Sequence, residues 1–232
     1  MKLNGIIGKG TGKLGSSVFA ISGGEQIVRE YNPVVSNPNT DAQVAQRAKL
    51  KLMSQIAAAL APGLGFAKKG LVSARNQFVS KNIGLVTYAD GKATVSLNNI
   101  HLTPSNIPFN ELAVTSSANN ISAALATAAD STIKRVAYFV YEQLDSGELK
   151  FVESKIISEA GQGRTFPTTF TVQQSAYVVY AYGIKDNSAD ATMRYENYEA
   201  EQAGSNVILD VISMFRTSDY TLTKSSAFLI EV

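Results

Sequence analysis

Glycines and lysines crowd one segment near the N-terminus in a spacing that could bind phosphate. Residues 10–15, GTGKLG, match the G-x-G-x-x-G pattern of dinucleotide-binding sites. Such a site needs its last glycine to open a helix within a βαβ unit. Here residues 18–21, VFAI, favour a strand, and Gly23-Gly24 follows too soon for a helix. The pattern therefore predicts tight backbone turns or close approach to another chain, not a phosphate cradle.

His101 is the only histidine, and the chain has no cysteine. A Ser-His-Asp triad would need His101, but the sequence contains no G-x-S-x-G and the surrounding NNIHLTPSN favours a loop. One histidine without cysteine also excludes the usual zinc sites. We therefore expect no catalytic residue, no metal ligand and no cofactor.

Two sets of carboxylates are candidates, one for a calcium site and one for a catalytic pair. Residues 186–190, DNSAD, begin like a calcium loop, but Ala191 replaces the required glycine and Asn197 the required glutamate. A glycosidase pair could in principle come from Glu142, Glu148, Glu153 and Glu159. These glutamates lie on or beside alternating strands, where a solvated sheet face explains them more simply. The sequence therefore predicts a protein that is not an enzyme.

Composition indicates a folded globular chain. It has 232 residues, of which 45% are hydrophobic and 17% charged. Neither a signal peptide nor an apolar run of about 18 residues is visible, so we expect a soluble protein made in a cytoplasm. The net charge of +2 is the sum of a net charge of +8 over residues 1–82 and a net charge of −6 over residues 83–232. This shift predicts a boundary near Asn82.

The first 82 residues predict an arm and a helical hairpin. Residues 1–39 form a Gly-rich extended arm with a β-hairpin around Gly23-Gly24. Residues 40–82 form two helices, the first with an N-terminal capping box of Thr40 and Gln43. Its expected apolar stripe is Val44, Ala48, Leu52, Ile56 and Leu60. The second helix is expected over residues 65–80, with Leu71, Ala74 and Phe78 on one face.

Strand patterns dominate from Asn82 onward. Turns are expected at Asp90-Gly91 and at residues 145–147, and residues 165–172 supply a further strand. Because no helical spacer is long enough for a parallel crossover, residues 83–202 predict an antiparallel immunoglobulin-like β-sandwich. Residues 203–232 form a C-terminal extension, in which residues 219–232 favour a strand. The fold class is therefore α+β.

The charge separation admits two interpretations. A chain that is basic at one end and acidic at the other can meet its own copies head to tail, and such contacts close into rings. Alternatively, both charged regions face solvent. The cations on the predicted helices spread around them without interleaved aromatics, so a specific DNA reader is not expected. Non-specific contact with DNA stays open.

Residues 5–53 resemble the N-terminal signature of a family of uncharacterised proteins from Bacteroidetes and their phages. The signature combines a glycine-rich start, an Arg-x-x-P element and the pattern N-P-x-T-x-x-Q-x-x-Q-R. The Arg-x-x-P element spans residues 29–33 here and is one residue longer than in the family. The last pattern is carried by Asn37, Pro38, Thr40, Gln43, Gln46 and Arg47. The resemblance covers residues 5–200, so residues after 203 look like an addition.

The resemblance implies a structural protein of the virion, since relatives include virion proteins of crAss-like phages. We expect a ring subunit of the tail or neck near the portal. Its partners would be copies of itself and other tail, neck or portal proteins, close to phage DNA and away from membranes. The expected assembly residues are Gly23, Gly24, Arg29, Asn37, Pro38, Thr40, Gln43, Gln46 and Arg47.

The alternative is a β-sandwich module on a bacterial surface that binds carbohydrate or protein. Its platform would be the tyrosine-rich strands, residues 177–182 and 195–198. Tyrosine suits such surfaces because it presents a rigid ring with a polar tip. The absence of a visible secretion signal counts against this alternative.

Overall fold

The computed structural model describes residues 10–22, 24–32, 39–108, 112–127, 131–158, 164–186 and 220–232. The chain is an α+β protein whose sheets are antiparallel. It divides into two compact units, residues 1–44 and 45–232, each described by itself below. Three of the expected assembly residues, Gly23, Asn37 and Pro38, lie outside the described residues.

The first unit contains a three-stranded antiparallel sheet in the order β1-β2-β3. Its strands are β1 (Gly12–Leu14), β2 (Ser17–Ser22) and β3 (Glu25–Glu30). Ser22 pairs with Glu25, so only residues 23 and 24 connect β2 to β3, which confirms the predicted hairpin. Gly24 has a φ of +84°, a conformation that favours glycine. We refer to β1, β2 and β3 together as the arm sheet.

Helix α1 (Asp41–Ala59) starts at the predicted cap. The Thr40 Oγ1 accepts a hydrogen bond from the Gln43 N–H at 3.4 Å, as an N-cap side chain should. Towards the end of α1 the buried positions are Met53, Ile56 and Ala57. Pro62 then lies in a 3₁₀ turn, η1 (Ala61–Gly63), where the α-helix has ended.

The second helix is shorter than predicted. Helix α2 (Ala74–Asn82) begins where the Ser73 side chain accepts a hydrogen bond from the Asn76 N–H. The prediction of a helix over residues 65–80 is therefore wrong for residues 65–73. Gly70 has a φ of +59°, which no helix contains, and Leu71 is 80% exposed instead of lining a helix face.

The remaining strands form three sheets. A two-stranded hairpin of β4 (Thr87–Ala89) and β5 (Lys92–Thr94) lies between the short 3₁₀ turns η2 (Ile83–Leu85) and η3 (Leu97–Asn99). A three-stranded sheet has the order β10-β7-β6. In the central five-stranded sheet the order is β12-β11-β8-β9, and β13 also pairs with β11. The bounds are β6 (Leu112–Ser117), β7 (Asn120–Ala126), β8 (Ile133–Gln143), β9 (Leu149–Ile157), β10 (Thr165–Thr171), β11 (Ala176–Asp186), β12 (Tyr220–Leu222) and β13 (Ser226–Glu231).

Most of the predicted turns are confirmed. Asp90 and Gly91, with φ of 51° and 75°, connect β4 to β5, and Gly147, with a φ of 81°, lies in the turn between β8 and β9. The hairpin of β6 and β7 was not predicted. Its sequence, LAVTSSANNISAALA, is rich in alanine and serine, which carry little β-propensity. Only packing against the central sheet makes these residues strands.

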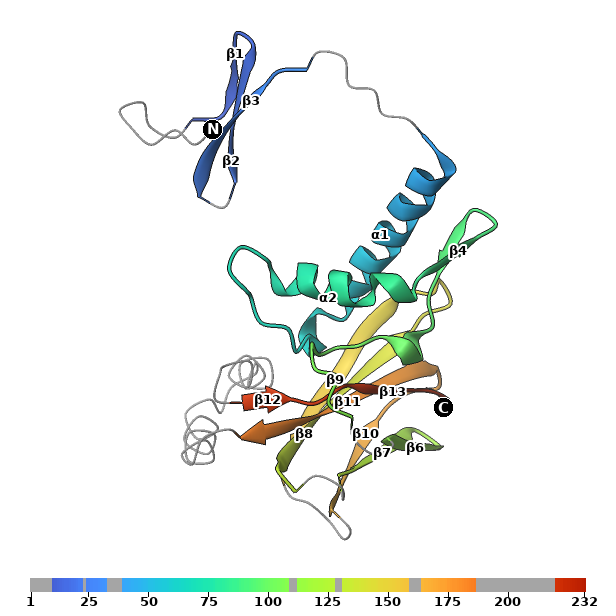
Figure 1. Ribbon diagram of the computed structural model, residues 1–232. Helices are drawn as coiled ribbons and strands as arrows, with labels where there is room; N and C mark the ends of the chain where they lie inside the picture. The colour runs from blue at the N-terminus through green and yellow to red at the C-terminus, as the bar shows by residue number, and fades with distance from the viewer. Residues whose placement is uncertain are drawn as a thin grey trace. The chain divides into compact units, whose positions relative to one another are not determined.

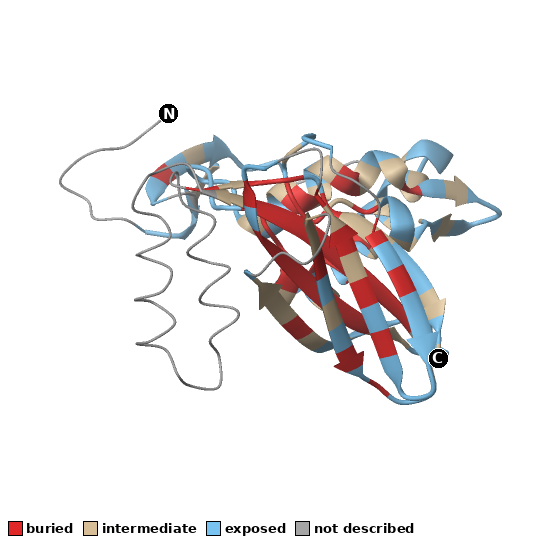
Figure 2. Cartoon of the chain, turned by 90° about the horizontal axis from the view of Figure 1, so that it is seen from below, coloured by how far each residue is buried: buried red, intermediate tan, exposed pale blue. Residues whose placement is uncertain are grey.

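Strands β8 and β11 of the central sheet are buried on both faces, as the red strands in Figure 2 show. Alternate residues of β8, such as Val136 and Tyr138, belong to a hydrophobic cluster with β6, β7 and β10. Their neighbours, such as Ala137 and Phe139, belong to a second cluster with the helices. Figure 1 shows α1 and α2 on one side of β8 and β11, and β6, β7 and β10 on the other. Because helices and strands share one cluster, no boundary in packing falls at Asn82.

The C-terminal residues belong to the central sheet. Strands β12 and β13 both pair with β11, which confirms the strand expected in residues 219–232 over the part described. Thr103 Oγ1 donates to the carbonyl of Thr223 at 2.6 Å, and the Leu102 N–H donates to Ser225 Oγ at 2.7 Å. The predicted extension therefore contains two strands of the main core, while residues 203–219 lie outside the described residues.

Candidate functional site

One face of the arm sheet is mainly apolar. Residues paired across antiparallel strands project to the same face. Phe19 pairs with Val28, Ile21 with Gln26, and Leu14 with Ser17, which is opposite Glu30. This face therefore carries four apolar side chains, the single charge of Glu30, and the polar Ser17 and Gln26, of which Gln26 is buried. We refer to it as the apolar arm face, with apolar members Leu14, Phe19, Ile21 and Val28.

The opposite face of the arm sheet is more polar. It carries Val18, Ala20 and Ile27 together with Lys13 and Arg29, by the same pairing. The Lys13 Nζ lies 3.5 Å from the centre of the Tyr31 ring, a cation–π contact. Two of the expected assembly residues lie in the arm sheet, Arg29 on this face and Gly24 in the β2–β3 turn.

The arm sheet has no hydrophobic core of its own. Among its described residues only Gln26 is buried, and its Nε2 donates to the Gly10 carbonyl at 3.2 Å. Every buried apolar residue in the described parts of the chain lies at Met53 or later. Leu14 is 74% exposed, and Ile21 and Ile27 are also exposed. A small sheet needs an apolar face packed against something to be stable in water, so this sheet needs a partner surface.

The other described assembly residues lie at the start of α1. Thr40 and Gln43 are joined by the capping hydrogen bond, while Gln46 and Arg47 are exposed on the next turn. A capping box needs a second bond, from the Gln43 side chain back to the start of the helix. The buried Gln43 Oε1 has no hydrogen-bond partner, so only half of the predicted capping box forms. The positions 43, 46 and 47 share one side of the helix by their spacing.

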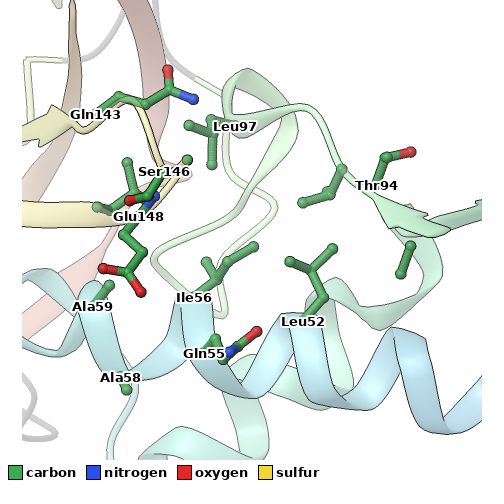
Figure 3. Close-up of a pocket in the computed structure, with 14 residues that line it drawn as sticks. Leu52, Gln55, Ile56, Ala58, Ala59, Thr94, Leu97, Gln143, Ser146 and Glu148 are labelled. Atoms are coloured by element: carbon green, nitrogen blue, oxygen red, sulfur yellow. The ribbon is translucent and has the colours of Figure 1, made fainter.

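A groove of about 720 Å³ lies beside α1 in the second unit. Its walls come from α1, from residues 93–97 around the end of β5, and from the β8–β9 turn. Figure 3 shows Leu52, Ile56 and Leu97 directed into the same space. We refer to it as the α1 groove, lined by Leu52, Gln55, Ile56, Ala58, Ala59, Ala93, Thr94, Val95, Leu97, Gln143, Ser146, Gly147, Glu148 and Leu149. Sequence analysis did not predict the groove, because three distant segments build it.

The carboxylates do not assemble into an acid–base pair in the groove. Glu148 is the single charged residue in its lining. Glu142 lies 3.7 Å from Lys150, and Glu153 lies 3.4 Å from Lys155. Glu159 lies outside the described residues. Within the described ranges, no cluster of three or more His, Asp or Glu side chains could hold a metal ion.

His101 lies in a loop that a buried asparagine holds in place. The Asn82 side chain is fully buried, accepts from the His101 N–H at 2.8 Å and donates to the His101 carbonyl at 2.9 Å. Burial lowers the pKa of the His101 imidazole, and the charges of Lys224 and Lys81 lower it further. The two charged groups that shift this pKa are lysines, which cannot orient an imidazole as a catalytic base in the way a carboxylate does.

The tyrosines of β11 are not a binding platform. Tyr177, Tyr180 and Tyr182 are all buried, so the expectation of an exposed tyrosine surface is wrong for this strand. The Tyr180 hydroxyl donates to the Leu97 carbonyl at 2.8 Å, and burial raises the pKa of that hydroxyl. Both faces of the central sheet are covered, which sequence alternation alone did not reveal. Residues 195–198 lie outside the described residues.

The described residues define the class of this protein as α+β with antiparallel sheets. No helix in those ranges is both long and apolar enough to cross a membrane. Comparison with protein-family models and with curated proteins finds no match for this chain.

Proposed function

We propose that this chain is a non-enzymatic structural subunit of a bacteriophage virion. It forms a ring of the tail or neck near the portal, by head-to-tail contacts between copies. Its other partners are neighbouring tail, neck or portal proteins, and its location is the virion, close to the phage DNA. The source of the class is the resemblance of residues 5–200 to the family of uncharacterised proteins, whose relatives include virion proteins of crAss-like phages.

The observation that carries the proposal is the apolar arm face, on which Leu14 and Ile21 are exposed. Leu14, Phe19, Ile21 and Val28 project from one side of a sheet that buries none of them. Exposed apolar surface of this kind marks a protein–protein contact in soluble proteins. A three-stranded sheet without a core of its own suits a subunit that contacts its neighbour through that sheet.

The separation of charge supports assembly between copies. Residues 1–82 carry a net charge of +8 and residues 83–232 a net charge of −6. Opposite charges on different parts of one chain favour heterologous contacts, in which one part of a copy meets another part of the next. Contacts of this type close into rings when the rotation between copies allows it.

The fold is proposed to be an immunoglobulin-like sandwich with added helices. Side chains of the β10-β7-β6 sheet and the central sheet form one hydrophobic cluster, as in a sandwich. The Tyr138 hydroxyl of β8 accepts from the Leu125 N–H at 2.8 Å and donates to the Phe166 carbonyl. These bonds tie the two sheets together, and they support a sandwich that serves as a rigid subunit body.

The copy number in purified virions tests the proposal. Quantitative mass spectrometry of particles of the phage that encodes this chain should find a small fixed number, on the order of one or two dozen copies, as closed rings require. Hundreds of copies would place the protein on the capsid surface or among internal cargo. Absence from the particle would overturn the virion assignment.

A further inference from the structure

We propose that Lys81, His101 and Lys224 form a binding site for a phosphate group. The three side chains come from three segments, namely the last turn of α2, the loop after η3 and the connection between β12 and β13. We refer to the three residues together as the cation cluster. The inference goes beyond the proposed function and does not depend on it, because it concerns the chemistry of this cluster alone.

Side-chain hydrogen bonds join the end of α2 to the loop that carries His101. The buried Asn82 side chain, next to Lys81, accepts from the N–H of His101 and donates to its carbonyl. The Lys81 Nζ donates to Asn106 Oδ1 at 2.6 Å, further along the same loop. Lys81 and His101 are both half-buried, so their side chains are confined where the helix and the loop meet.

The same loop is joined to the β12–β13 connection, which carries Lys224. The Leu102 N–H donates to the buried Ser225 Oγ at 2.7 Å. The Lys224 N–H donates to the Ile107 carbonyl at 2.9 Å. The cation cluster therefore lies on a backbone that is already fixed, so binding an anion there costs little ordering of the chain.

The positive charge of the cation cluster is not compensated by a carboxylate. Within the described residues, neither Lys81 nor Lys224 forms an ion pair, whereas Lys150 and Lys155 each do. Burial lowers the pKa of the His101 imidazole, and both lysines of the cluster lower it further by charge repulsion. A bound anion would relieve this repulsion and, in turn, would favour the protonated imidazole.

The donors of the cation cluster suit a phosphate group. A lysine ammonium carries three N–H donors, and Lys81 uses one of them on Asn106. The Lys224 side chain is exposed and has no bond in the described part of the chain, so all of its donors are open to a ligand. Phosphate oxygens accept several charge-assisted bonds at once. Two sources supply this group, a free phosphate ion and the backbone of DNA, and the experiment distinguishes them.

Titration of His101 tests the inference, because the only histidine of the chain gives a single imidazole signal in NMR spectra. Sulfate is the probe, since it has the shape of phosphate and keeps the same charge throughout the titration. Chloride at the same ionic strength is the salt control. We expect sulfate to raise the pKa of His101 by at least about 0.5 relative to chloride, which corresponds to about threefold tighter binding by the protonated form.

Variants that remove one charge assign this effect to the cation cluster. Lys224→Gln should lose most of the sulfate-dependent shift, and it should fold normally because the side chain is exposed. Lys92→Gln, at an exposed position of β5, is the matched control and should keep the full shift. An His101 pKa that sulfate leaves unchanged, or equal losses in the two variants, would overturn the inference.

A labelled DNA duplex of arbitrary sequence distinguishes the two sources of phosphate. Fluorescence anisotropy compares the affinity of the unmodified chain, Lys224→Gln and Lys92→Gln for the duplex. A loss of at least about threefold confined to Lys224→Gln supports the site and assigns it to backbone phosphates. Equal affinities of all three proteins, together with the sulfate-dependent shift, support the site with a free phosphate ion as its ligand. Neither result depends on the copy number in virions, so failure of this inference leaves the proposed function standing.

Discussion

The Tyr141 hydroxyl on β8 accepts a hydrogen bond from the backbone N–H of Gly63 at 3.1 Å. The same hydroxyl donates to the Leu60 carbonyl at 3.3 Å. These two bonds add to the bond that the Gly63 N–H also donates to the Leu60 carbonyl at 3.0 Å. A Cβ placed on Gly63 would lie 2.7 Å from this hydroxyl oxygen and 3.1 Å from Cγ of Phe139. This contact fixes α1 against the central sheet and so shapes the wall of the α1 groove.

We expect Gly63→Ala to lower the free energy of unfolding by about 1–3 kcal/mol, because the added methyl group overpacks the contact. Tyr141→Phe should cost about 0.5–1.5 kcal/mol, because it removes the hydroxyl bonds while the Gly63 N–H still donates to the Leu60 carbonyl. The double variant should lose less than the sum, since the hydroxyl that collides with the new methyl is gone. Urea unfolding followed by far-UV circular dichroism measures each value. Strict additivity would contradict the predicted clash.

Tyr180 distinguishes a core role from a binding platform. Tyr180→Phe should cost about 0.5–1.5 kcal/mol, since it removes the hydrogen bond to the Leu97 carbonyl. Tyr180→Ala should cost about 3–5 kcal/mol, since it leaves a cavity in the buried core. Tyr88→Ala, at a half-buried position of the β4–β5 hairpin, is the control and should cost less. A stable Tyr180→Ala variant that had lost only carbohydrate binding would contradict this role.

The stability of the protein should depend on pH through His101. Burial, Lys224 and Lys81 lower the pKa of this imidazole below its ordinary value of 6.5. The unfolded chain then binds the proton more readily than the folded chain. Stability should therefore fall as the pH drops below about 6.5 and level off below the folded pKa. The chain has no other histidine, so His101→Gln should remove this part of the slope. Identical pH profiles of urea midpoints for both proteins would contradict the shift.

Deletion of residues 1–36 should leave a folded body that no longer assembles. The two hydrophobic clusters of the second unit use no residue before Leu52, so their packing survives the deletion. The apolar arm face is lost, and with it the surface that we assign to the contact between copies. Light scattering should report a monomer at concentrations where the full chain is larger, and thermal unfolding should stay cooperative. A truncated chain that still assembles would remove the arm from the interface.

Local sequence signals were reliable wherever a short stretch of chain decides the structure. Thr40 predicted the start of α1 because a cap is a bond between residues three apart. Asp90-Gly91 and Gly147 predicted their hairpins because positive φ angles select such residues at tight turns.

Tertiary packing decided what local signals could not. Tyr177, Tyr180 and Tyr182 are buried because α1, α2 and the β10-β7-β6 sheet cover both faces of the central sheet, and no pattern within β11 specifies a second cover. The alanine-rich β6–β7 hairpin forms through long-range contacts that override weak propensity. The α1 groove likewise exists only where three distant segments meet. Residue type and spacing determined where the chain turns and where a helix is capped. The fold decided which residues are buried, because burial depends on segments far apart in sequence.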